Sequence, residues 1–150
     1  MLGQIERCEV NPTASTMWKI ANGMKVSFTQ FINPTNNDVQ LIAFNQVPVL
    51  TEAEGRVRIF TIFPFDDLRR FEIYSLSFDA DADLTTEPHL KGTQEFITVY
   101  SGELTIERKE KQYILKEGNS IRFKADTPHS YRNSGTSTCQ VHMVIYYPNS

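Results

Sequence analysis

Short runs of alternating hydrophobic and polar residues dominate the chain from Val39 onward. A period of two places successive side chains on opposite faces, which predicts β-strands with one face turned toward a core. Glycine, proline or asparagine separates many of the runs, and short strands at near-regular spacing favour an antiparallel barrel or sandwich. The predicted strands are Val39–Phe44, Val57–Phe63, Phe71–Phe78, Glu95–Tyr100, Glu103–Arg108, Gln112–Leu115, Ser120–Phe123, His129–Arg132 and Gln140–Tyr147.

The N-terminal part of the chain follows a helical pattern instead. Hydrophobic residues recur at helical spacing between a candidate N-cap at Thr13 or Ser15 and the glycine at position 23. A stretch rich in Asn, Pro and Thr follows, and this composition is typical of a linker. We therefore expect a short α-helical segment, a linker and one β-domain, at residues 1–32, 33–39 and 40–150 respectively.

Composition and charge narrow the possible functions. Forty per cent of the 150 residues are hydrophobic, and ten Phe and six Tyr favour a core built from strands. The net charge of −3 gives no whole-chain argument for nucleic-acid binding. No apolar run has the length of a membrane span, and the N-terminus lacks the layout of a signal peptide. Cys8 and Cys139 are too few for a disulfide framework, so we expect a cytoplasmic protein.

Two of the predicted strands carry ionisable side chains on the face that should turn inward. Glu95 shares its face with hydrophobic residues, and His129 shares its face with Tyr131. An ionised carboxylate among apolar neighbours is costly unless it is paired or bound to a metal. Together with His89, these residues make a set of two histidines and one carboxylate, which suits Zn, Fe(II), Mn or Ni and leaves coordination positions open.

The spacing of these residues resembles the two motifs of the cupins, a family of small β-barrels. The first cupin motif, His-x-His, then Glu, then Gly, is matched except that Lys91 replaces the second histidine. In the second motif, Lys124 and Asp126 replace the usual Pro and Gly. The matching anchor positions are His89, Glu95, Gly102, Gly118, His129 and Asn133. The resemblance covers roughly residues 40 to 148 and implies a mainly β fold, a cupin-type double-stranded β-helix (jelly-roll) barrel.

The cupin resemblance implies a metal or ligand pocket inside the barrel. In one interpretation His89, Glu95 and His129 hold a divalent transition metal. In the other the scaffold persists without a metal, and the same side chains hydrogen-bond to each other or to water. Lys91 could contact a bound ligand, neutralise Glu95 or lie exposed in a loop. Ligand-binding candidates are Lys91, Tyr131 and Met143, whereas His142 is out of phase with the inward residues of its strand and is expected outside.

The N-terminal segment resembles the second half of a lambda-repressor-like (Xre-type) helix-turn-helix domain. The matching features are Ile5-Glu6, the turn at Pro12, and the Thr-hydrophobic-x-x-Ile-Ala pattern that ends at Ala21. The first two helices of that family pattern, and the start of the recognition helix, are absent from the sequence. Either the start codon is misplaced or the gene truncated, or the chain is a cupin with a docked remnant. The DNA-binding candidates are Gln4 and Arg7.

The order of helical segment, linker and barrel resembles that of small bacterial transcription regulators, which carry a helix-turn-helix domain fused to one cupin. In them the cupin senses an effector and contributes to a homodimer. The resemblance implies a sensor that binds a small polar effector, directly or through a metal. DNA binding is expected only if a complete helix-turn-helix exists upstream, because base edges are read mainly from the start of the recognition helix. The alternative is a metal-dependent cupin enzyme, a dioxygenase or an isomerase. The lost second histidine and the helix-turn-helix remnant favour the regulatory interpretation.

Overall fold

The computed structural model describes Lys19 and residues 39–148. Apart from Lys19, the helical segment predicted at residues 1–32 lies outside these described residues. The linker up to residue 38 and the DNA-binding candidates Gln4 and Arg7 lie outside them as well. Within the described part of the chain, no helix combines the length and the apolar character needed to cross a bilayer.

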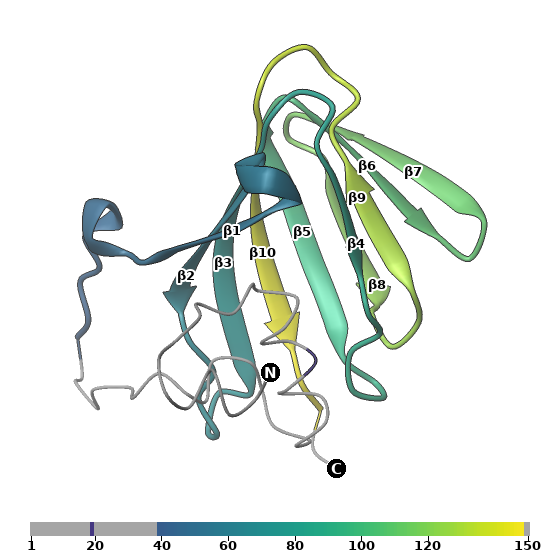
Figure 1. Ribbon diagram of the computed structural model, residues 1–150. Coiled ribbons are helices and arrows are strands. Elements are labelled where there is room, and N and C mark those ends of the chain that lie inside the picture. The colour runs from purple at the N-terminus through teal and green to yellow at the C-terminus, as the bar shows by residue number, and fades with distance from the viewer. Residues whose placement is uncertain (1–18, 20–38, 149–150) are drawn as a thin grey trace, which may run out of the picture.

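Residues 49–146 form two antiparallel sheets (Figure 1). The larger sheet has the strand order β1-β2-β3-β10-β5-β8 and the smaller one β4-β9-β6-β7. Short 3-10 helices, Phe44–Gln46 and Ala53–Gly55, lie before and after β1. The strands are β1 (Val49–Glu52), β2 (Val57–Phe63), β3 (Phe71–Phe78), β4 (Asp83–Thr86), β5 (Gln94–Ser101), β6 (Glu103–Arg108), β7 (Lys111–Lys116), β8 (Ser120–Lys124), β9 (His129–Arg132) and β10 (Cys139–Tyr146).

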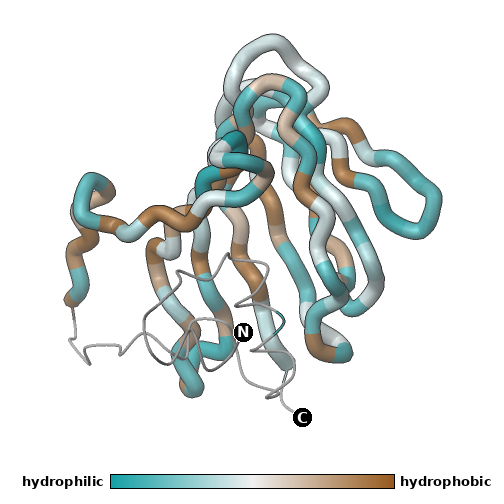
Figure 2. Tube along the Cα trace, in the orientation of Figure 1, coloured by the Kyte–Doolittle hydropathy of each residue, from teal (hydrophilic) through white to brown (hydrophobic). Residues whose placement is uncertain are grey.

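The alternation of the sequence is what positions the core (Figure 2). Along β10 every second residue is buried, and β5 follows the same rule. Inward residues from both sheets make one hydrophobic cluster, which contains Tyr74 and Leu76 of β3 and Leu104 and Ile106 of β6. The polar residues buried among them are Glu72, Ser75, Ser77, His89, Thr93, Glu95, His129 and Asn133. This polar set is where chemistry can take place inside an otherwise apolar barrel.

One predicted strand is wrong and two strands were not predicted. Residues 39–43 form no strand, and a 3-10 helix begins at Phe44. Val39 and Leu41 are 83% and 95% exposed, so their hydrophobic character does not report an inward face. Each of the missed strands, β1 and β4, lies at one edge of its sheet. No residue of either is fully buried, and their sequences therefore show only weak alternation.

Asn133, the last residue of the second motif, is a structural residue. Its side chain is buried and donates to the carbonyl oxygens of Phe78, at 2.9 Å, and Ser137, at 2.8 Å. Its Oδ1 accepts from the backbone N–H of Gly135 at 2.9 Å. A buried amide with its groups paired in this way stabilises the loop between β9 and β10 and fixes where β9 ends.

The two motif glycines allow a matched test of how closely the backbone packs in the turns that they occupy. Gly102 and Gly118 have φ values of +82° and +81°, but a Cβ at Gly102 would lie 2.9 Å from the Cα of Cys139, whereas one at Gly118 would meet nothing within 4 Å. We expect Gly102→Ala to lower the free energy of unfolding by about 2–4 kcal/mol, because left-handed strain adds to overpacking against backbone. Gly118→Ala should cost only about 1–2 kcal/mol. Urea unfolding of both variants checks this, and equal losses would contradict the close approach at Gly102.

Candidate metal centre

Three separate segments bring the candidate ligands together. Glu95 points inward from β5, and His129 points inward from the start of β9. His89 belongs to the loop between β4 and β5, where its backbone N–H donates to the carbonyl oxygen of Ala125 at 2.9 Å. The N–H of Ala125 in turn donates to the carbonyl oxygen of Thr93 at 2.9 Å. This pair of backbone hydrogen bonds ties the His89 loop to the end of β8.

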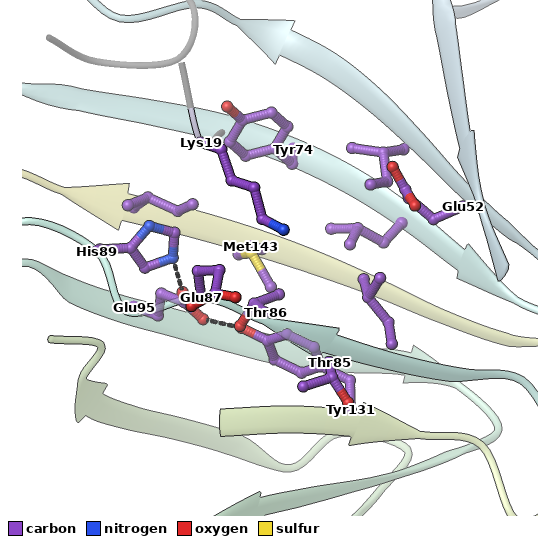
Figure 3. Close-up of a pocket in the computed structure, with 14 residues that line it drawn as sticks. Lys19, Glu52, Tyr74, Thr85, Thr86, Glu87, His89, Glu95, Tyr131 and Met143 are labelled. Carbon is purple, nitrogen blue, oxygen red and sulfur yellow. Dashed lines mark hydrogen bonds and ion pairs between the residues drawn. The ribbon is translucent and has the colours of Figure 1, made fainter. Parts of the chain in front are cut away.

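The side chains of His89, Glu95 and His129 converge on one carboxylate oxygen. Oε1 of Glu95 lies 2.7 Å from Nε2 of His89 and 3.3 Å from Nε2 of His129. All three side chains are buried, and one ligand atom from each lies within 4.8 Å of the others. The hydroxyl of Tyr131 donates a hydrogen bond to the second carboxylate oxygen, Oε2 (Figure 3).

The tautomer of His129 follows from its other nitrogen. Nδ1 lies 2.9 Å from the carbonyl oxygen of Thr127, and because a carbonyl can only accept, Nδ1 carries the hydrogen. In a neutral ring Nε2 therefore presents a lone pair, and it faces the Glu95 carboxylate at 3.3 Å. Nε2 is buried and makes no hydrogen bond within the described part of the protein. A cation, either a proton on Nε2 or a metal ion, resolves this repulsion.

The residues present fit a divalent transition metal. Ligand atoms about 2.0–2.2 Å from one ion stand roughly 3.0–3.5 Å apart in tetrahedral or octahedral geometry, close to the 2.7 and 3.3 Å that separate Oε1 of Glu95 from the two histidine nitrogens. The hydrogen bond from His129 to Thr127 and the one from Tyr131 to Glu95 orient the ligands, as partners behind metal ligands commonly do. Two histidines and one carboxylate also leave coordination positions open for a small molecule.

Without a metal, the electrostatics of the cluster favour a negative charge on Glu95 and a positive charge on His129. Burial alone would raise the pKa of Glu95, but the interactions of its carboxylate with His129 and His89 outweigh burial and hold that pKa well below its usual range. Burial would lower the pKa of His129, and the interaction with Glu95 outweighs this and raises it. Burial, helped by Glu95, raises the pKa of the Tyr131 phenol, which therefore remains a donor.

A cavity of about 160 Å³ opens onto this cluster. Tyr131 and Met143, both ligand-binding candidates, line it, and so do His89 and Glu95. Lys91 is exposed and is not part of the lining, so the expectation that it reaches a bound ligand is not supported by its position. The full lining is Lys19, Glu52, Ile59, Tyr74, Leu76, Leu84, Thr85, Thr86, Glu87, His89, Glu95, Tyr131, Met143 and Ile145.

His142 lies on the opposite face of β10, as its phase predicts. It is exposed and stacks on the Tyr100 ring at a centroid distance of 4.7 Å. It is therefore separate from the cluster of His89, Glu95 and His129, and the chain has only three histidines. This makes His142 a natural control residue for metal-binding experiments.

A second buried carboxylate, Glu72, was not predicted. It accepts hydrogen bonds from the hydroxyls of Tyr74, at 2.7 Å, and Tyr147, at 2.9 Å. Ile145 of β10 pairs with Glu72 on one side and Glu95 on the other, so the two carboxylates belong to one row across the sheet. The alternation of Glu72 with the inward residues Tyr74 and Leu76 is the signal that would have found it.

Comparison with known proteins places these features in a family. Residues 79–146 match the family model described as the cupin domain. The chain is 36% identical over 151 residues to the HTH-type transcriptional regulator SutR of Escherichia coli (strain K12), covering 100% of this chain and 80% of the relative.

Solved structures agree with the sequence match. An HTH_3 family transcriptional regulator from Vibrio cholerae superimposes with a TM-score of 0.81 at 33% identity, over 99% of this chain and 80% of that one. The cupin domain of an XRE family transcriptional regulator from Enterobacter cloacae gives a TM-score of 0.61 at 31% identity, over 63% of this chain and 99% of that one. The chain therefore belongs to the XRE-type helix-turn-helix transcriptional regulators that carry a cupin domain.

Proposed function

We propose that the cupin barrel is the effector-sensing domain of a transcriptional regulator. Its cavity binds a small polar molecule, directly or through a divalent metal held by His89, Glu95 and His129. The observation that carries this proposal is the cavity of about 160 Å³ that opens onto His89 and Glu95, inside a chain related to regulators throughout its length. A chamber of this size suits a metabolite rather than a macromolecule.

Different residues would have different roles in the cavity. His89, Glu95 and His129 would hold the metal, and Tyr131 and the Thr127 carbonyl orient two of these ligands. When bound, the metal supplies open coordination positions for a polar group of the effector. The apolar lining residues exclude water, which strengthens polar contacts at the centre.

We infer roles for the remaining parts of the regulator from the family relationship. Residues 40–150 would form the sensor. Gln4 and Arg7, in the N-terminal segment at residues 1–32, are the candidates for DNA contacts, which we expect only where a complete helix-turn-helix exists. A homodimer in the cytoplasm matches this arrangement, because two-fold symmetric regulators read paired half-sites on DNA. Effector binding would change how the two N-terminal segments are presented to an operator.

A metabolite screen tests the sensor proposal. We expect small polar metabolites to raise the melting temperature of the zinc-loaded chain. If the effector coordinates the metal, His129→Ala should lose zinc binding and effector binding together. Thermal shift on the wild type, followed by calorimetry of the hits on the variant, measures this. Unchanged effector affinity in His129→Ala would exclude the metal-bridged form and leave direct binding.

The ligand set also supports a second candidate function, a metal-dependent enzyme. Two histidines and one carboxylate with open positions are the ligands of non-haem Fe(II) oxygenases. Oxygen uptake by the Fe(II)-loaded chain in the presence of a screened metabolite, with a product detected by mass spectrometry, would favour the enzyme. Reversible binding without conversion of the metabolite would favour the sensor.

A further inference from the structure

Lys19 precedes the barrel by about thirty residues, yet its side chain lines the same cavity as His89 and Glu95. We propose that the cavity takes a small α-amino acid with an apolar side chain, and that Lys19 binds its carboxylate. The ligand would then contact the N-terminal segment and the barrel at the same time. This inference rests on the proposed function and names the ligand class and the coupling residue for that site.

The position of Lys19 is the first observation. Figure 3 shows its ammonium extending into the cavity, with Met143 below it and His89 and Glu95 to one side. It is the only lysine or arginine among the described lining residues. No salt bridge joins it to another residue that the structure describes. A compact ammonium that forms no salt bridge with any described residue can attract a ligand anion.

The other charges of the lining restrict the ligand further. Glu52 and Glu87 also line the cavity, so a second negative charge on the ligand would meet these two carboxylates. The same carboxylates favour an ammonium group on the ligand. One carboxylate and one ammonium on a single small molecule is the charge pattern of an α-amino acid.

The apolar wall and the volume set the side chain of that amino acid. The wall consists of Ile59, Leu76, Leu84, Met143 and Ile145. The cavity of about 160 Å³ is similar to the engineered apolar cavity of roughly 150 Å³ that accepts benzene. A short aliphatic or thioether side chain fits this space, and a second ring or a long charged chain does not.

Because the ligand would bridge Lys19 and the barrel, its binding is linked to the position of the N-terminal segment. A ligand shifts a conformational equilibrium only by its difference in affinity for the two states. Here that difference is the contact with Lys19, which exists only when the segment lies against the cavity. Lys19 would thus transmit occupancy of the barrel to the N-terminal segment, for which DNA contacts are proposed.

The test compares amino acids with amines that lack only the carboxylate. Alanine, valine and methionine are titrated calorimetrically into the zinc-loaded full chain, beside ethylamine, isobutylamine and 3-methylthiopropylamine. At least one amino acid should bind and its matched amine should not. Lys19→Met should weaken that binding about 10- to 100-fold, as expected for a lost hydrogen bond to a charged group, and Lys19→Arg should retain part of it. Lys91→Met, the exposed control, should bind like the wild type.

Hydrogen exchange of the peptide that spans residue 19 tests the coupling. Valine or methionine should slow exchange there in the wild type and in Lys91→Met, and not in Lys19→Met. Equal amino-acid affinity in Lys19→Met, equal binding of an amine, or unchanged exchange would overturn the inference. If no amino acid binds while zinc still binds, the ligand class is wrong and the metal centre stands. If zinc itself does not bind, the metal-bridged form of the proposed function fails.

Discussion

Replacing His129 with alanine is expected to lower the affinity of the chain for Zn²⁺ by at least about 100-fold. Mutating groups that only support metal ligands typically costs 10- to 100-fold, and His129 would be one of three direct ligands. Its Nε2 faces Glu95 with a lone pair in the neutral ring, because Nδ1 donates to the Thr127 carbonyl. The variant therefore removes the nitrogen atom whose lone pair faces the Glu95 carboxylate and needs a cation between the two.

Competition with a zinc-binding dye, together with metal content after dialysis, measures this effect. His142→Ala is the matched control, since that histidine is exposed and stacks on Tyr100 outside the barrel. His129→Gln serves if the alanine variant does not fold, because a glutamine keeps volume and a donor for Thr127. Zinc affinity that survives in both His129 variants, or falls equally in His142→Ala, would rule out the proposed centre.

Four strands could be predicted with exact bounds, and each of them has at least two buried inward side chains. Val57–Phe63, Phe71–Phe78, Glu103–Arg108 and His129–Arg132 were predicted with the bounds that the structure has. In them, inward side chains pack against the opposite sheet, so the alternation in sequence reports a real difference in burial. The inward residues of the edge strands β1 and β4 are only partly buried, and the existence of these strands depends on pairing with β2 and β9, which local sequence does not encode.

Whether a residue of the candidate site could be predicted also depends on whether it lies in a strand. Glu95, His129 and Tyr131 could be placed inward because they sit in strands, where the phase of one residue determines that of the next. His89 and Lys91 belong to a loop, which has no such period, and only one of them turns into the barrel. The lysine that does line the cavity, Lys19, comes from a distant segment, and no spacing within a motif could have predicted that contact.

The pH dependence of stability is expected to change sign when zinc is added. In the metal-free protein the raised pKa of His129 gives stability that is full below the unfolded value of about 6.5 and is lost as pH rises through the folded pKa. The lowered pKa of Glu95 gives stability that is present above about 4.3 and is lost as pH falls through its folded pKa. The metal-free cluster therefore contributes most between these two limits, and raising the pH from 6 to 9 should weaken it.

Zinc reverses the alkaline part of this dependence, because a metal ligand must be a neutral imidazole and protons compete with the ion. Free zinc at 1,000 times its Kd should stabilise the fold by about 4 kcal/mol, and that condition is reached more easily at pH 8 than at pH 5.5. Urea unfolding at both pH values, with zinc or with a chelator, measures the four free energies. A zinc effect that does not grow with pH would argue that His89 and His129 are not its ligands. If zinc has no effect but the metal-free dependence appears, a proton is the cation that lies between His129 and Glu95.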